Sequence, residues 1–451
     1  MKTFSLLLAP LFLFACDREV DTGAGYRLMV DTPTEPVRAL DVLFVVDDNG
    51  AMAEEQQVLA DGVARFIATL DERAGVRPDL HIGVTSTTVG TGPVGGGGDA
   101  CAGNGDDGRL LVADTCPALD RPFLVDVADP DDPDGPRTIN YPDGQLAETL
   151  GCMTQLGTTG CGFEQQFEAM RRALDGSNQA NDGFLRRDAM LLVVLVTDED
   201  DCSAFDRTIY DSSEDDRDEP LGEMSSFRCF EFGVTCDQPD ARAIGDRTGC
   251  VPRADSPYLE HPDAFVEFLE DLKGGPGMVM VAAVTGDPTP VAVIDDESKI
   301  PAELSVNDLC PQPEQRLPWG AGPAIRIHAL LDSLPRNTSA PICERDSGDL
   351  GRIADAAASN MLGSACLWAT PFDSDEDRAG IQPVCRAELR LASGEWVELP
   401  ACAEDSSGQS CFEVREDREL CGWTDSRLIA AVEGLTLPGE RIRVECLQAR
   451  E

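Results

Sequence analysis

Lysine and histidine are nearly absent from this chain of 451 residues. Only three residues of each type occur: Lys2, Lys273, Lys299, His81, His261 and His328. Because no C-x-x-C pair accompanies the few histidines, zinc sites are not expected. The shortage of lysine leaves 36 basic residues against 83 acidic ones, a formal net charge of −47. Such an acidic surface repels nucleic acid and anionic membrane faces, which excludes both as expected partners.

Motifs of the common enzyme classes are also missing. The sequence contains no Gly-x-Ser-x-Gly turn, no His-Glu-x-x-His helix and no phosphate-binding loop with Gly-Lys-Ser/Thr. None of the histidines has a marked nucleophile nearby, and His81 lies within an expected strand, where we predict a structural role. We therefore expect a protein that is not an enzyme.

The N-terminus carries the one apolar run that reads as a targeting signal. Lys2 precedes an apolar run from Phe4 to Ala15, which is too short for a permanent bilayer span and predicts a signal peptide over residues 1–15. The run ends in Leu-Phe-Ala-Cys, which resembles the lipobox of bacterial lipoproteins, so Cys16 is the predicted lipidation site. We expect an exported protein anchored to the bacterial cell envelope, periplasmic or at the cell surface. Its membrane contact would be through this lipid only.

Cysteine usage supports export. Of 17 cysteines, Cys16 is set aside, and the remaining even number in an exported chain suggests disulfides. Short separations favour three pairs: Cys101–Cys116, Cys152–Cys161 and Cys310–Cys343. The cysteines from Cys101 to Cys343 and those from Cys366 onward are both even in number, so each group is expected to pair internally. Cys366 would then link the last predicted helix to the C-terminal region.

Strand-like and helix-like patterns alternate between residues 39 and about 370. Apolar runs predict strands, and apolar positions at helical spacing predict helices. The predicted strands cover residues 41–47, 80–88, 189–197 and 277–285, and the predicted helices 52–71, 163–174, 261–272 and 348–362. This alternation predicts an α/β domain with a mostly parallel sheet. Loop-rich insertions are expected at about 89–150, 202–258 and 287–346, the first with a short strand at 109–114.

The residue patterns at the two ends of the chain differ from the pattern of this domain. Residues 16–38 are polar and contain glycine and proline, so we expect the lipidated cysteine to be followed by a tether. Residues 375–451 alternate apolar and polar with period two, which predicts a small β-rich region. A region of this size buries little core and needs disulfides for stability.

Acidic clusters follow two of the predicted strands. "DVLFVVDDNGAM" runs from an apolar strand into Asp47 and Asp48, and "LLVVLVT" runs into the acidic residues 198–201. Parallel sheets bind ligands at the carboxyl ends of their strands, so both clusters mark the same candidate edge.

This arrangement resembles the von Willebrand factor type A domain family. That family places Asp-x-Ser-x-Ser after one strand, a threonine in a later loop and an aspartate after another strand, and these residues form a metal-ion-dependent adhesion site. "DVLFVVDDNGAMAEEQ" and "LLVVLVTDEDDCS" carry the resemblance, which covers residues 39–370. It implies a doubly wound sheet, with Asp47 and Asp198 as the matching aspartates.

The other site positions depart from the family pattern. Asn49 and Ala51 replace the two serines, and Thr158 or Thr159, in "GTTGCGFEQQFEAM", would supply the threonine. The side-chain carbonyl of Asn49 can bind a hard cation. Ala51 has no side-chain oxygen, so a water molecule would have to serve as the ligand in its place. The resemblance thus implies a degenerate site for Mg²⁺ or another divalent cation. The alternative is an inherited fold whose carboxylates are merely solvated.

For function, the resemblance implies an envelope-anchored binding or adhesion-type module that recognises a protein or a surface polymer. In the family, an acidic group of the partner often completes the metal shell. Here the site is itself rich in carboxylates, so a basic partner is also compatible. Two alternatives remain: an envelope hydrolase whose active site is built by the insertions, and a structural surface protein without metal.

Overall fold

The structure is a computed structural model, and it describes most of the chain from residue 27 onward. The described residues are 27–33, 37–74, 77–129, 131–132, 135–273, 276–296, 303–310, 320–344, 346, 348–361, 365–367, 370–374, 378, 381–391, 393, 395–402, 410–418, 421, 426–433 and 441–447. The predicted signal peptide, Cys16 and the first part of the predicted tether lie outside these residues. None of the helices within them is long and apolar enough to cross a membrane.

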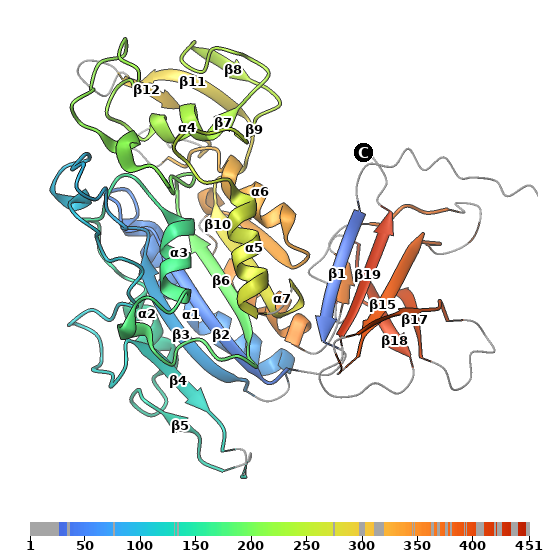
Figure 1. The fold of residues 1–451 in the computed structure, drawn as a ribbon. Coiled ribbons are helices and arrows are strands. Elements are labelled where there is room, and N and C mark those ends of the chain that lie inside the picture. The colour runs from blue at the N-terminus through green and yellow to red at the C-terminus, as the bar shows by residue number, and fades with distance from the viewer. Residues whose placement is uncertain are drawn as a thin grey trace, which may run out of the picture.

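A seven-stranded sheet forms the centre of the larger part of the chain (Figure 1). Its order is β13-β10-β6-β2-β3-β4-β5, in which the first five strands are parallel and β4 and β5 are antiparallel. The strands are β2 (Ala39–Val46), β3 (Asp79–Ser86), β4 (Phe123–Val127), β5 (Thr138–Ile139), β6 (Met190–Val196), β10 (Val279–Thr285) and β13 (Asn337–Pro341). All seven residues of β6 are buried, as expected for a central parallel strand with covered faces. The sheet confirms the predicted α/β class.

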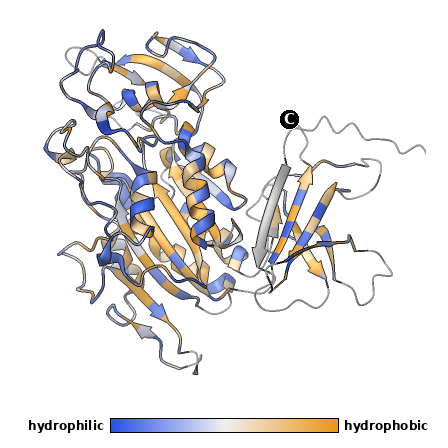
Figure 2. Cartoon of the chain, in the orientation of Figure 1, coloured by the Kyte–Doolittle hydropathy of each residue, from blue (hydrophilic) through white to orange (hydrophobic). Residues whose placement is uncertain are grey.

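Helices cover both faces of this sheet, so the domain is doubly wound, as the resemblance implied. One core contains α1 (Ala53–Ala74), α2 (Leu146–Met153) and α7 (Asp349–Met361). The other contains α3 (Gln166–Leu174), α5 (Pro262–Lys273) and α6 (Ile325–Ser333). Val42 and Phe44 of β2 point to the first core, and Leu43 and Val45 to the second. Figure 2 shows the corresponding pattern, with apolar strands between helices that are polar on their outer sides.

Two of the predicted insertions hold elements of the domain itself, which corrects their assignment. The segment 89–150 supplies β4, β5 and α2, and the segment 287–346 supplies α6 and the edge strand β13. Residues 109–114 are not a strand. The sequence did not predict these elements because they are short and lie among Gly, Pro and Cys residues. An edge strand such as β13 is stabilised by pairing with a strand distant in sequence more than by its own residue pattern.

The remaining insertion segments pack together next to the carboxyl ends of the parallel strands of the central sheet. Residues 202–258 contribute α4 (Phe227–Gly233), β7 (Val234–Thr235), β8 (Gly245–Arg247) and β9 (Val251–Pro252). Residues 287–310 contribute β11 (Val291–Asp296) and β12 (Glu303–Val306). A small sheet, β12-β11-β8, unites the two segments. We call this unit the roof; it lies at the top of Figure 1.

The C-terminal region forms a separate β unit of two sheets. One has the order β1-β19-β15-β16 and the other β14-β18-β17, and side chains from both share one core. The strands are β1 (Arg27–Pro33), β14 (Ala365–Leu367), β15 (Cys385–Arg390), β16 (Trp396–Leu399), β17 (Cys411–Glu416), β18 (Leu428–Glu433) and β19 (Arg441–Leu447). The unit therefore begins at residue 365, ten residues before the predicted boundary of 375. The predicted tether is corrected as well, because residues 27–33 are a strand paired with β19.

Short 3₁₀ helices complete the described elements. They are η1 (Asp99–Cys101), η2 (Gln179–Asn181), η3 (Arg207–Tyr210), η4 (Pro276–Met278) and η5 (Ile342–Glu344).

All sixteen cysteines after Cys16 form disulfides, and the two groups pair internally, as predicted. The bonds are Cys101–Cys161, Cys116–Cys152, Cys202–Cys229, Cys236–Cys250, Cys310–Cys343, Cys366–Cys421, Cys385–Cys446 and Cys402–Cys411. Cys310–Cys343 and the link from Cys366 to the C-terminal unit are confirmed. The predicted pairs Cys101–Cys116 and Cys152–Cys161 are wrong, because the fold, rather than the shortest chain separation, brings Cys101 to Cys161 and Cys116 to Cys152.

Candidate functional site

The candidate site lies where the strand order of the sheet reverses. β2 has β3 on one side and β6 on the other, so the connections leaving β2 and β6 run to opposite faces. Asp47 follows β2 and Asp198 follows β6 by two residues. The Asp47 N–H donates to Val196 O over 2.9 Å, which fixes one strand end against the other. Such switch points are where open α/β sheets bind ligands.

Asn49 joins the acidic side chains that meet there. Its Nδ2 donates to Asp47 Oδ2 over 3.3 Å, to Asp198 Oδ1 over 3.2 Å and to Glu164 Oε1 over 3.1 Å. Its Oδ1 accepts the Ala51 N–H over 2.8 Å, which orders the turn before α1. All four residues are buried, with exposed fractions of 7% or less. We call Asp47, Asn49, Glu164 and Asp198 the acidic centre.

Glu164 is the member that the sequence did not place in the site. It precedes α3 in the loop that follows α2, and its loop is fixed by neighbours of Asp47. Gly160 N donates to Asp48 O over 2.7 Å, and Thr88 Oγ1 donates to Asp48 Oδ1 over 2.8 Å. Glu164 lies two residues before α3, within the range 163–174 that the sequence predicted as helix, so its pattern gave no signal of a site.

A buried glutamine holds the start of the same loop. Gln56 Nε2 donates to both Asp47 O and Gly157 O over 2.8 Å, and its Oε1 accepts the Gly157 N–H over 3.0 Å. Further along, Cys161 N donates to Thr88 Oγ1, and the Cys101–Cys161 disulfide anchors that residue. The loop is thus fixed at both ends before Glu164 enters the acidic centre.

Burial makes ionisation of this centre costly. It raises the pKa of Asp47 to about 7, although hydrogen bonds from Asn49 and Thr197 lower it. Burial also raises the pKa of Glu164 and of Asp198 well above their ordinary values, and the neighbouring carboxylates add to both shifts. These groups therefore hold protons at pH values where exposed carboxyls have lost them, or need a positive charge beside them.

The other predicted site residues lie outside the acidic centre. Thr158 is half-buried and Thr159 is exposed, and no hydrogen bond joins either to Asp47, Asn49 or Asp198 in the described part of the chain. Ala51 lies at its rim. Asp48 faces Thr88, and its pKa is raised to about 6, chiefly by burial.

The side chains of the acidic centre are of the kind that bind a hard cation, but a hydrogen-bond donor lies between them. Carboxylate and amide oxygens are the ligands that Mg²⁺ and Ca²⁺ prefer, at 2.0–2.6 Å. Here an amide nitrogen occupies the middle, 3.1–3.3 Å from the carboxylate oxygens. Accordingly, among the described residues no group of three or more His, Cys, Asp or Glu side chains is arranged to hold a metal ion.

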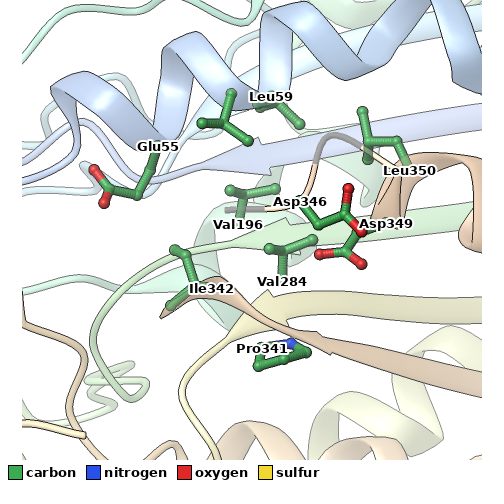
Figure 3. A pocket seen from close by; sticks show the side chains of 10 residues that line it. Glu55, Leu59, Val196, Val284, Pro341, Ile342, Asp346, Asp349 and Leu350 are labelled. Carbon is green, nitrogen blue, oxygen red and sulfur yellow. The ribbon is translucent and has the colours of Figure 1, made fainter. Parts of the chain in front are cut away.

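The acidic centre opens into a cleft beneath the roof. Its volume is about 450 Å³, and its lining includes Glu164 and Asp198 below and α4 and the strand β12 above. This size falls within the range of ligand-binding clefts. A second hollow lies between α1, α7 and the ends of β6 and β10, lined by apolar side chains such as Leu59 and Ile342 (Figure 3). It encloses only about 30 Å³, enough for a water molecule.

None of the histidines is placed for catalysis in this cleft. His81 Nδ1 lies 2.7 Å from Phe184 O, and His328 Nε2 lies 3.2 Å from Gly286 O. His261 Nδ1 accepts the Asp263 N–H. Each ring is bonded to a backbone group, and none of the three lines the cleft.

These features define the class of the domain. The order β13-β10-β6-β2-β3-β4, with its antiparallel strand at the β4 edge and acids after β2 and β6, gives a von Willebrand factor type A-like fold. The predicted resemblance is thereby confirmed at the level of the fold.

Comparisons with known proteins find similarity only at a low level. No family model and no curated protein matches the sequence. The chain is similar to the pilus adhesin SpaC from Lactobacillus rhamnosus GG, with TM-score 0.33, 8% identity and coverage of 94% of this chain and 41% of the adhesin. It is similar to a von Willebrand factor type A protein from Catenulispora acidiphila (TM-score 0.29, 9% identity, coverage 96% and 67%). It is also similar to the adhesive tip pilin GBS104 from Group B Streptococcus agalactiae (TM-score 0.28, 10% identity, coverage 96% and 84%). The chain thus spans about two fifths of the length of SpaC.

Proposed function

We propose that this protein is an exported, envelope-anchored binding module of adhesion type that recognises a protein or a surface polymer. The observation that carries this proposal is the convergence of Asp47, Glu164 and Asp198 on Asn49 at the mouth of a cleft. Such a centre offers charged hydrogen-bond acceptors at the floor of a cleft, which suits the recognition of a partner. Lipidation at Cys16 would supply the anchor.

We propose further that a divalent cation completes the ligand site. Rotation of the Asn49 amide by about 180° would exchange Nδ2 for Oδ1 and present a fourth oxygen to the cation. The cation would offset the buried negative charge of the acidic centre, and water would take the place of the absent Ala51 hydroxyl.

Thermal unfolding in the presence of Mg²⁺ or Mn²⁺ tests the cation. A cation bound only to the native state should raise the Tm of the full chain in a concentration-dependent manner. Asp47→Asn should abolish the shift, and Ala51→Ser should enlarge it by restoring a hydroxyl. Asp114→Asn, an exposed residue outside the cleft, is the control for a change of one charge. No shift in the wild type at millimolar cation would refute cation binding.

A further inference from the structure

All the charged side chains that line the cleft are acidic. They are Glu164, Asp198, Glu199, Asp200, Asp296 and Asp308. No lysine, arginine or histidine is among the described residues of the lining. Asp200 is already occupied, because its carboxylate accepts the N–H groups of Arg326 and Ile327 at the start of α6. Asp308 likewise accepts the N–H groups of Cys310 and Ala321. The roof closes the cleft above, so a group that enters it meets Glu164 and Asp198 below.

Buried acids elsewhere in this protein are neutralised by arginine from the same chain. Asp41 is fully buried and receives Arg186 Nε over 2.8 Å. Asp201 is likewise fully buried and receives Arg326 Nη2 over 3.0 Å. Asp126 is ion-paired with Arg137. The fold therefore places a guanidinium group beside each of these three buried carboxylates.

The acidic centre has no such group in the part of the chain that the structure describes. Among the described residues, no Lys, Arg or His forms an ion pair with Asp47, Glu164 or Asp198, which are 0%, 1% and 6% exposed. Buried carboxylates without a counter-charge are costly, and a positive charge supplied from outside would offset that cost. Because Glu164 and Asp198 also line the cleft, the charge could reach them from it.

The roof adds an aromatic wall to this acidic lining. Phe227 and Phe230 of α4 line the cleft, with ring centroids 5.7 Å apart. A guanidinium group binds carboxylates through its edge and packs its flat face on aromatic rings, whereas the ammonium of lysine is a more strongly hydrated point charge. Acidic groups beside phenyl rings in one cleft thus favour arginine.

We propose that the cleft binds the guanidinium group of an arginine side chain on a basic protein partner. The inference builds on the proposed binding module, since it names the chemistry of the partner that the module recognises. At Glu164 and Asp198 the guanidinium group would take the place of the proposed cation. The side chain enters below the roof, with its charge towards Asp198 and Glu164 and its flat face along the Phe230 ring.

Fluorescence anisotropy with labelled peptides tests this proposal on the full chain. The probe is a short Gly/Ser peptide with two arginines, and the matched peptides carry citrulline, lysine or glutamate at those positions. Citrulline keeps the shape of arginine without its charge. We expect the arginine peptide to bind, the lysine peptide to bind more weakly, and the citrulline and glutamate peptides to lose at least roughly tenfold in affinity.

Variants place the binding in the cleft. Glu164→Gln combined with Asp198→Asn should weaken the arginine peptide by roughly tenfold, since these are the two carboxylates that the guanidinium group faces. Phe230→Leu should weaken it by about threefold, since only the aromatic face is lost. Asp114→Asn combined with Asp143→Asn removes the same charge from exposed positions outside the cleft and should leave binding unchanged.

The outcomes separate this inference from the proposed function. Equal binding of arginine and citrulline peptides, equal losses in both double variants, or no binding of the arginine peptide would overturn it. Titrations are run in EDTA and in Mg²⁺. A Tm shift with Mg²⁺ but no arginine binding would refute the arginine site alone. Arginine binding without any response to Mg²⁺ would refute the cation part of the proposed function alone.

Discussion

At the scale of the residue, Asn49 and Glu164 distinguish this site from the pattern it resembles. An amide stands where the family pattern has its first serine, and Glu164, rather than Thr158 or Thr159, contacts that amide. Both changes add bulk to the centre, and the second adds negative charge. The acidic centre therefore carries more carboxyl groups than the family pattern. Its contribution to the free energy of unfolding depends more strongly on a proton or cation that neutralises them.

Replacement of Glu164 tests whether Glu164 or a threonine of the same loop, Thr158 or Thr159, is the cation ligand. Glu164→Gln should remove most of the Tm shift caused by Mg²⁺, because one of three buried carboxylates is lost. At pH 8 in EDTA it should also raise the Tm, by about 2–4 °C for each 1 kcal/mol of repulsion relieved. Thr158→Val and Thr159→Val are the matched controls and should leave the shift intact. A shift lost in a threonine variant but kept in Glu164→Gln would assign the ligand to the threonine.

At the scale of the element, Lys273 ties the end of α5 to the amino end of the sheet. Its side chain is 1% exposed, and Nζ donates to Arg186 O over 2.6 Å and lies 3.8 Å from Asp41 Oδ2. Burial lowers the pKa of Lys273 from 10.5 to about 8 in the folded protein, against the attraction of Asp41. The neutral amine can still donate to the Arg186 carbonyl, so the link survives deprotonation.

This lowered pKa predicts how stability depends on pH. Between pH 8 and 10.5 the unfolded chain binds more protons at Lys273 than the folded chain, so the free energy of unfolding should rise with pH. The rise is at most about 3 kcal/mol over the whole window. Urea unfolding at pH 7, 8, 9 and 9.5 should show it in the wild type but not in Lys273→Met. Parallel pH profiles of the two proteins would contradict the prediction.

The same scale shows what the sequence could and could not predict. Strands with long buried runs, such as β2 and β6, were predicted because their apolar pattern is continuous, and the acids after them marked Asp47, Asn49 and Asp198. β13 and α6 were missed because they are short and flanked by loop residues. The position of Glu164 in the site and the Cys101–Cys161 bond depend on which loops the fold brings together. Local sequence patterns carry no information about such contacts between distant loops.

At the scale of the whole molecule, the chain passes through the C-terminal unit twice. β1, near the start of the described chain, pairs along its length with β19 at the end, and the type A-like domain lies between them in sequence. Val37 N donates to Met361 O over 2.7 Å, so the two connections between the domain and the β unit leave side by side. An anchor at Cys16 would therefore reach the type A-like domain through the β unit, and a force on the anchor would act first on the pairing of β1 with β19.

This topology predicts that β1 unfolds with the C-terminal unit and not with the domain that follows it in sequence. Val444 is fully buried in β19, between Val30 of β1 and Ala387 of β15. Val444→Pro removes a backbone donor from this central strand, and proline is tolerated only at edges of sheets. Hydrogen exchange should then become faster in β1, β15 and β19, while β2, β6 and β10 keep their protection. Val444→Ala, which removes side-chain volume but keeps the N–H, should have a smaller effect on β1. If β1 keeps its protection in the proline variant while β15 loses it, β1 is held by contacts other than those with β19. If the central sheet loses protection as well, the two units are coupled more tightly than a pair of connecting segments allows.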